Sequence, residues 1–198
     1  EEHGHGDEEG HEEEEHGHDV DPHTWQSVRL ARAMVANIHE GLAAEDPEGA
    51  EEYRANAETY LAELAELERE VEQAVATLPD DRRVLVTSHD TFGYFARDHG
   101  FRVLGAGLLS LTTEAADPSA AELARLAREV RESGVPALFA ENIADDRLVR
   151  QLARAAGLET APPLYTDALG PPGSPGATYA GMVRHNIRTI VTALGGAS

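Results

Sequence analysis

The first clear hydrophobic pattern begins a short distance into the chain. Apolar residues recur there at steps of three and four, as on one face of a helix, at Val28, Ala31, Val35, Ile38 and Leu42. Ser27 directly precedes the pattern, and a serine hydroxyl can accept a hydrogen bond from a free N–H of the first helical turn. The spacing therefore predicts a helix over residues 28–44.

A second, longer helical pattern opens at Asp46-Pro47, where Asp can act as the N-cap and Pro can occupy the first helical position. Its apolar positions alternate by four and three up to Pro79, at Tyr53, Ala57, Tyr60, Leu64, Leu67, Val71, Ala74 and Leu78. One helix over residues 46–78 would be about 45–50 Å long at 1.5 Å per residue, which exceeds one compact lobe. The same spacing would suit a coiled-coil dimer, but alanine and tyrosine at several of these positions favour packing within the chain.

Beyond Pro79 the period changes, and short β-rich runs alternate with helical ones. We expect strands at residues 84–87, 102–104, 137–140 and 163–165, and helices at residues 92–99, 119–133, 145–156 and 178–194. Gly100, Gly134 and Gly157 each follow a helical run, where a left-handed residue commonly ends a helix. This alternation predicts an α/β fold with a parallel sheet flanked by helices.

Composition limits the kinds of partner and of metal ligand that the chain can have. The net charge is −21, and eleven of the 37 acidic residues lie in residues 1–21 together with five histidines. We expect this tract to be a flexible loop, because it has too few apolar side chains to offset its ordering entropy. A nucleic-acid partner is not expected, since phosphate binding needs clustered cations. No cysteine is present, so any metal must be held by His and carboxylate groups.

Two features concern the setting of the chain. No apolar run approaches the roughly 18 residues that a membrane-spanning helix needs. The sequence begins inside the biased tract, without an initiating Met or an apolar leader, so we expect a fragment or a trimmed product.

Three short segments carry candidate metal ligands: DPHTW at 21–25, TSHD at 87–90 and YTDALG at 165–170. His89 and Asp167 each follow an expected strand, so both should emerge at the carboxyl edge of the sheet, where ligands of open α/β sheets bind. His23 precedes a helix on the other side of the long helix. Imidazole and carboxylate groups are ligands that zinc or manganese accepts when sulfur is absent.

These segments, in this order, resemble the ZnuA/TroA-like metal-binding proteins of ABC transporters. The resemblance runs over residues 18–194 and includes VTSHDTFGYF and the FAEN strand end. It implies two α/β lobes joined by a rigid helix, with a metal held between them by His23, His89, Asp167 and a histidine of an amino-terminal lobe that has no counterpart here. The corresponding domains are a loop over 1–21, the last segment of the amino-terminal lobe over 22–45, the linking helix over 46–78 and the carboxy-terminal lobe over 79–198.

Other polar residues are candidates for supporting roles. Glu141, Asp21, Ser88 and Asp90 could accept or relay hydrogen bonds that orient the imidazoles, although a solvated or helix-capping role is the alternative. His3, His5, His11, His16 and His18 are expected to capture metal weakly, but a metal-sensing or merely soluble loop is also possible. We interpret His39, His99 and His185 as structural.

The combined hypothesis is extracytoplasmic, high-affinity binding of zinc, with manganese as the alternative, and delivery to an ABC transporter permease. The protein would be monomeric, non-enzymatic, and either periplasmic or anchored to the outer side of a membrane. One alternative is a metal-buffering or adhesin-type surface lipoprotein. Another is a zinc hydrolase, which the missing HExxH motif disfavours.

Overall fold

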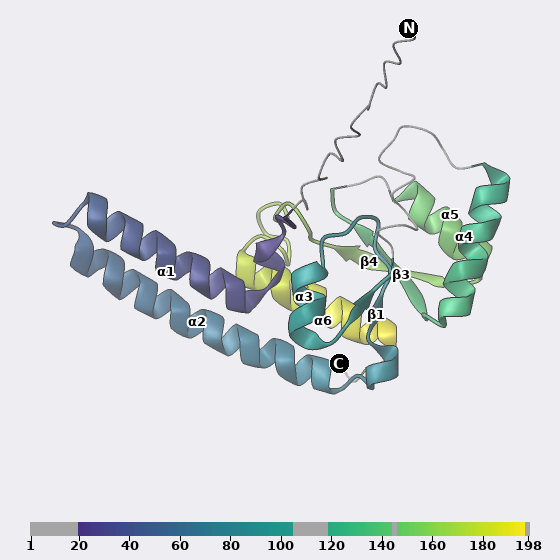
Figure 1. Cartoon of the computed structure of the whole chain (residues 1–198), viewed down its shortest axis with the longest axis horizontal. Coiled ribbons are helices and arrows are strands. Elements are labelled where there is room, and N and C mark those ends of the chain that lie inside the picture. The colour runs from purple at the N-terminus through teal and green to yellow at the C-terminus, as the bar shows by residue number, and fades with distance from the viewer. Residues whose placement is uncertain (1–19, 105–118, 144–145, 197–198) are drawn as a thin grey trace, which may run out of the picture.

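The computed structural model describes residues 20–104, 119–143 and 146–196. It is a helix-rich α/β structure in which a long helical hairpin projects from a body with short parallel strands (Figure 1). The predicted α/β class is thereby confirmed. Apart from residues 20 and 21, the acidic tract with its five histidines lies outside the described residues. No described helix combines the length and apolarity needed to cross a bilayer.

The projecting hairpin consists of α1 (Val28–Glu45) and α2 (Ala50–Ala76), which lie side by side after the short helix η1 (Thr24–Gln26). Ser27 caps α1 as predicted, since its side chain accepts the N–H of Leu30 at 3.1 Å. The predicted start of the second helix was wrong. Asp46 binds the Tyr53 hydroxyl at 2.6 Å and the Gly49 N–H at 3.3 Å, which closes a turn and delays the helix until Ala50. The observed α2 is about 40 Å long at 1.5 Å per residue.

The strands of the body are β1 (Val84–Leu85), β2 (Arg102–Val103), β3 (Ala137–Glu141) and β4 (Glu159–Leu164). The pairs β1–β2 and β3–β4 are both parallel, and the Phe139 N–H donates to the carbonyl of Val86 at 3.0 Å between them. β4 starts four residues earlier than predicted, and its register shifts between Phe139 and Glu141. The two prolines of β4, which lack an N–H, lie opposite this irregularity, as expected for proline in a strand.

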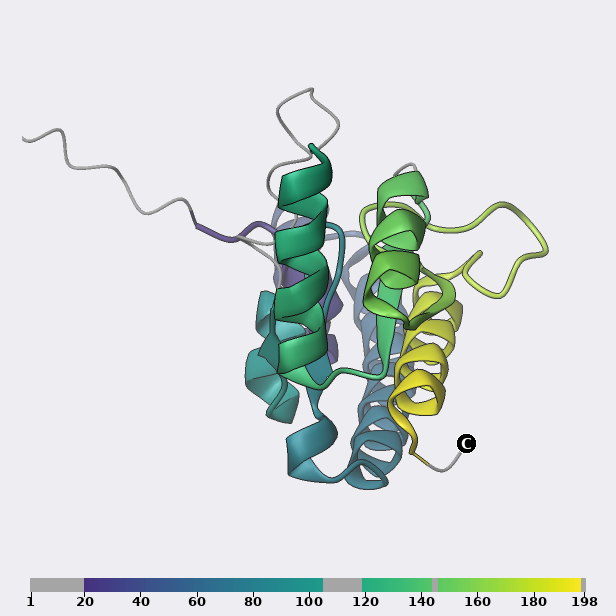
Figure 2. The same cartoon turned by 90° about the vertical axis from the view of Figure 1, so that its right-hand side faces the viewer.

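Helices cover both faces of the strands. On one face lie α4 (Ala120–Ser133) and α5 (Arg147–Ala156), and on the other lie α2, α3 (Gly93–His99) and α6 (Tyr179–Leu194) (Figures 1 and 2). Successive side chains of β3 point to opposite faces. Leu138 accordingly joins the core beneath α4 and α5, whereas Phe139 joins the core beneath α2 and α6. A second short helix, η2 (Asp80–Arg82), connects α2 to β1.

The predicted helix ends are also confirmed for three helices. Gly100, Gly134 and Gly157 follow α3, α4 and α5 with left-handed φ values of 70°, 73° and 72°. At the other end of α4, Ser119 and Glu122 form a reciprocal capping box. The carboxyl ends of β1 and β4 and the DPHTW segment lie together at one edge of the body.

Candidate metal centre

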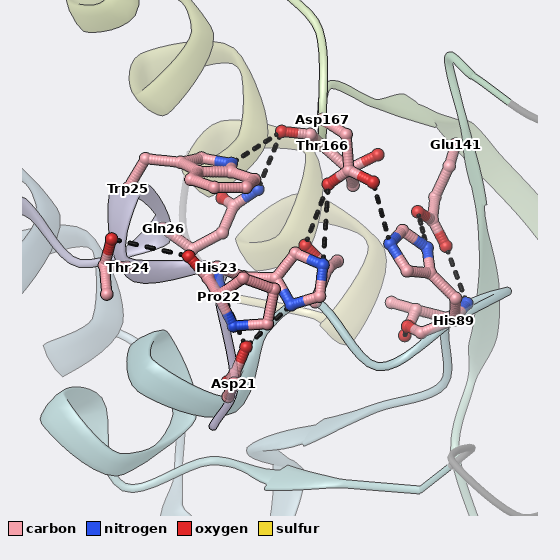
Figure 3. A network of polar contacts seen from close by, with 12 residues as sticks. Asp21, Pro22, His23, Thr24, Trp25, Gln26, His89, Glu141, Thr166 and Asp167 are labelled. Carbon is pink, nitrogen blue, oxygen red and sulfur yellow. Dashed lines mark hydrogen bonds and ion pairs between the residues drawn. The ribbon is translucent and has the colours of Figure 1, made fainter. Parts of the chain in front are cut away.

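Three side chains from distant parts of the chain meet at this edge (Figure 3). His23 precedes η1, His89 follows β1 and Asp167 follows β4, and each offers one ligand atom within 4.8 Å of the others. His89 Nε2 lies 3.1 Å from Asp167 Oδ2, and His23 Nε2 lies 3.9 Å from Asp167 Oδ1. The two imidazole centroids are 5.4 Å apart. Among the described residues, this is the one group of three or more His, Cys, Asp or Glu side chains whose ligand atoms lie close enough together to hold a metal ion.

His89 is oriented by the buried end of β3. Its Nδ1 lies 2.5 Å from Oε2 of Glu141, and its backbone N–H donates to the other carboxylate oxygen at 3.0 Å. The hydroxyl of Ser88 also donates to Glu141. Because Glu141 occupies Nδ1, the opposite nitrogen, Nε2, is left to face Asp167.

The charges of this pair are coupled. The hydrogen bond with Glu141 raises the pKa of His89 above its ordinary value, although burial acts in the opposite direction. Asp167 adds to the rise. Burial alone would raise the pKa of Glu141, whose side chain is fully buried, but the hydrogen bonds from His89 and Ser88 hold this pKa below its ordinary value. A cation at Nε2 of His89 would take the place of the proton that this environment favours.

His23 has a similar arrangement. Asp21 Oδ1 accepts the backbone N–H of His23 at 2.9 Å and lies 2.7 Å from its Nδ1. The carbonyl of Asp21 in turn accepts the hydroxyl of Tyr94, in α3, at 2.9 Å. Both imidazoles therefore present Nε2 to the centre and hold a carboxylate at Nδ1, which is how metal-binding histidines are commonly oriented.

The supporting residues expected from the sequence differ in what they contact. Glu141, Ser88 and Asp21 take part in the network around the imidazoles, as described above. Asp90 is exposed, and within the described ranges it makes no hydrogen bond or ion pair to His23, His89 or Asp167. The five histidines of the acidic tract lie outside the described residues.

Other histidines stay apart from the centre. His39 lies on the helical hairpin, His99 packs on Phe95 at 4.8 Å between ring centroids, and His185 bonds the carbonyl of Pro163 at 3.0 Å. Sequence reasoning overlooked Thr91, which donates to Asp167 Oδ1 at 3.4 Å. It also overlooked Trp25, Gln26 and Asn142, which bond the backbone beside Asp167. Their only sequence signal is adjacency to His23 and Glu141.

This group of side chains could hold a divalent ion, and one side of it is open. Two imidazole nitrogens and one carboxylate oxygen are ligands typical of zinc and also accepted by manganese. The side chains of His23, His89 and Asp167 keep 15%, 28% and 33% of their surface exposed, so further ligands can approach from solvent or from another part of the protein. Three protein ligands with one free position leave room for a fourth, as a tetrahedral zinc site requires.

Comparisons with known proteins agree with this arrangement. A profile of the family described as "ZnuA: Zinc-uptake complex component A periplasmic" matches residues 1–193. The chain is 37% identical to the zinc-binding protein TroA of Treponema pallidum over 181 residues, which cover 89% of the chain and 58% of that protein. It is 35% identical to the manganese-binding lipoprotein MntA of Halalkalibacterium halodurans over 175 residues, which cover 88% of the chain and 57% of that protein.

Solved structures give the same picture. The structure of TroA from Treponema pallidum matches with a TM-score of 0.77 and 36% identity, over 88% of this chain and 64% of that one. A Mn-bound periplasmic metal-binding protein from Candidatus Liberibacter asiaticus matches with a TM-score of 0.77 and 26% identity, over 91% of this chain and 65% of that one. The chain therefore spans 57% to 65% of the length of these relatives.

Proposed function

The chain belongs to the ZnuA family of periplasmic metal-uptake components, and from this membership we propose that it forms the metal-holding part of a solute-binding protein that delivers zinc to an ABC importer. The observation that carries the proposal is the convergence of His23, His89 and Asp167 within 4.8 Å. The proposed location is periplasmic or outside a membrane on a lipid anchor, and the proposed partner is the importer's permease. The family is one of solute-binding proteins and not of enzymes, so the zinc-hydrolase alternative is set aside.

Zinc is favoured over manganese by the donor set. Among the matched relatives, some are named for zinc and others for manganese, so relationship alone does not decide which metal this chain binds. Two imidazoles suit zinc, whereas manganese favours sites richer in oxygen donors. The proposed capture of metal by the histidines of residues 1–18 points in the same direction.

We further propose that residues 46–78 form the linking helix and residues 79–198 the carboxy-terminal lobe of a two-lobe protein. The support comes from an apolar groove of about 360 Å³ along the α1–α2 hairpin. It is lined by Val35, Ile38, His39, Leu42, Tyr53, Asn56, Ala57 and Tyr60, and Ile38 keeps 59% of its surface exposed. An apolar surface of this kind is typical of a face covered by another unit, here an amino-terminal lobe to which residues 22–45 would belong.

Delivery to an importer is preferred to buffering or adhesion on one ground. Streptococcal relatives matched by the chain carry the description "metal ABC transporter substrate-binding lipoprotein". A buffering or adhesin role would use the same metal centre, so the two differ in partner and not in chemistry.

The proposal is tested by isothermal titration of the chain with Zn²⁺ and with Mn²⁺. To remove competing sites, His3, His5, His11, His16 and His18 are first replaced by alanine. We expect one equivalent of zinc to bind more tightly than manganese, and His23→Ala, His89→Ala and Asp167→Asn each to weaken zinc at least about tenfold, the usual scale of a lost metal-site interaction.

The matched control is His39→Ala, a histidine on the hairpin that should leave zinc affinity unchanged. If all three ligand variants bound zinc as tightly as the parent chain, the site would be refuted. Tighter binding of manganese than of zinc would refute the choice of metal alone.

A further inference from the structure

The backbone on both sides of Asp167 is bonded to one side chain, that of Asn142. The amide oxygen of Asn142 accepts the N–H of Thr166 at 3.0 Å, and its amide nitrogen donates to the carbonyl of Ala168 at 3.0 Å. The side-chain amide of Asn142 therefore bonds the backbone on both sides of Asp167. Its oxygen is the acceptor arm, which bonds the residue before Asp167, and its nitrogen is the donor arm, which bonds the residue after it. Both arms are needed because Asp167 lies in a loop beyond β4, where no strand pairing fixes the backbone.

The same loop is tied to the segment that carries His23. The carbonyl of Thr166 accepts the indole N–H of Trp25 at 2.9 Å and the amide of Gln26 at 3.2 Å (Figure 3). These bonds set the distance between the segment of His23 and that of Asp167. They leave the carbonyl of Ala168 to Asn142, so the two sets of contacts act on different atoms of the loop.

The backbone of Asn142 is itself held in place by strand pairing. Its own N–H donates to the carbonyl of Leu164 at 2.9 Å, which continues the pairing of β3 with β4 to the end of the strands. The residue before it, Glu141, is buried and orients His89. Two consecutive residues at the end of β3 thus contact two different ligand segments.

We propose that Asn142 is a positioning residue for metal binding, which holds the Asp167 loop in register with His89 through its two backbone hydrogen bonds. This inference rests on the proposed function. It goes beyond the ligand set, because Asn142 itself has no role as a ligand and acts only through Asp167. Its loss frees the N–H of Thr166 on one side of Asp167 and the carbonyl of Ala168 on the other, so the carboxylate samples positions away from the two imidazoles.

The first test is a double-mutant cycle on the chain that lacks the five amino-terminal histidines, with Zn²⁺ affinity measured by titration calorimetry. Asn142→Ala should weaken zinc about tenfold, the scale expected when an orienting partner is lost. In an Asp167→Asn background the same change should cost less than about twofold, because residues that act through one another are not additive.

Asn56→Ala, an exposed asparagine of α2 beside the apolar groove, is the control and should leave zinc affinity unchanged. An equal loss from Asn142→Ala in both backgrounds would overturn the inference, as would no loss in the first. Absence of zinc binding by the parent chain would instead overturn the proposed function, and the positioning role with it.

A second measurement needs no metal and separates positioning from general loosening. In amide hydrogen exchange, Asn142→Ala should speed exchange at Thr166 severalfold but leave Tyr165 unchanged, because the Tyr165 N–H is held by Asn186 at 2.9 Å. Asn142→Asp keeps the acceptor arm and should preserve protection at Thr166. Equal acceleration at Tyr165 and Thr166, or none at Thr166, would refute the positioning role.

Discussion

Glu141→Gln tests how far the candidate metal centre depends on a buried carboxylate that is not one of its three candidate ligands. Glutamine has nearly the same size and can still accept hydrogen bonds from Ser88 and from the backbone of His89 through its one oxygen. The other oxygen, 2.5 Å from His89 Nδ1, becomes an NH₂ group. Two donors then face each other unless His89 changes tautomer, and that change would place a proton on Nε2, the nitrogen that faces Asp167.

The expected loss is about 10- to 100-fold in zinc affinity, the range for removal of a group that orients a metal-binding histidine. This corresponds to about 1.4–2.8 kcal/mol. Full burial of the Glu141 side chain places the expected effect toward the upper end, because solvent has little access to replace the missing acceptor.

The raised pKa of His89 also predicts how zinc affinity changes with pH. Since Glu141 raises the pKa of His89, protons should begin to displace zinc above the ordinary His value of about 6.5. Glu141→Gln removes the largest cause of that rise, so its zinc affinity should be weaker at pH 8 but should begin to fall only at lower pH. The two curves should therefore converge on acidification.

The folding stability of the metal-free chain should also depend on pH through His89 and Glu141. The raised pKa of His89 stabilises the fold below the unfolded pKa, and this contribution is lost as pH rises through the folded pKa. The lowered pKa of Glu141 stabilises the fold above its unfolded value, and this is lost as pH falls through the folded pKa. The pair should stabilise most between about pH 4.5 and 6.5, and Glu141→Gln should flatten that maximum.

The assays are zinc titration calorimetry at several pH values and thermal unfolding of the metal-free chain. Glu132→Gln, an exposed position on α4, is the charge-matched control. If Glu141→Gln bound zinc as tightly as the parent chain with an unshifted pH profile, the orienting role of Glu141 would be refuted.

Two further predictions concern the surroundings of the centre. A Cβ at Gly93 would lie 2.7 Å from Asp21 Oδ2, so Gly93→Ala should move that carboxylate from His23, weaken zinc severalfold by calorimetry and leave the melting temperature nearly unchanged; a loss of stability without a loss of affinity would contradict this. Leu67 is fully buried on α2, so Leu67→Ala should lower the free energy of unfolding by about 2–5 kcal/mol in urea titrations, and less than about 1 kcal/mol would mean that α2 does not form this core.

Elements with a strong periodic pattern were predictable, and irregular ones were not. The existence of α2 and its buried face were predictable from Leu64, Leu67 and Val71, because helical spacing and burial coincide there. The start of α2 was missed because Asp46 bonds Tyr53 and Gly49 and so closes a local turn, which an Asp-Pro pair does not reveal. The start of β4 was missed because its prolines argue against a strand, yet they lie where the pairing with β3 is irregular.

The candidate site divides along a similar line. His23, His89 and Asp167 were predicted from motifs next to element boundaries and from a family resemblance, and the structure brings them together. Asn142 was not predicted, because its bonds to Thr166 and Ala168 depend on the path of a loop more than twenty residues away. Composition and periodicity carry no record of such a path.

The three ligand side chains differ in how firmly they are held, and this difference bears on release of the ion. Each imidazole has a carboxylate at Nδ1, whereas the carboxylate of Asp167 receives one hydrogen bond from a non-ligand side chain, that of Thr91 at 3.4 Å. Asp167 is also the most exposed of the three. The loop that carries it is tied to the His23 segment through the carbonyl of Thr166, which Trp25 and Gln26 both bond. It is tied to the end of β3 through the two bonds of Asn142. A displacement of the DPHTW segment would therefore withdraw His23 and remove one of the two sets of bonds that hold the Asp167 loop, while Asn142 kept the other set and Glu141 kept His89 in place. Movement of the segment before α1 alone should therefore lower the metal affinity of the candidate centre, as delivery of the ion to the proposed importer would require.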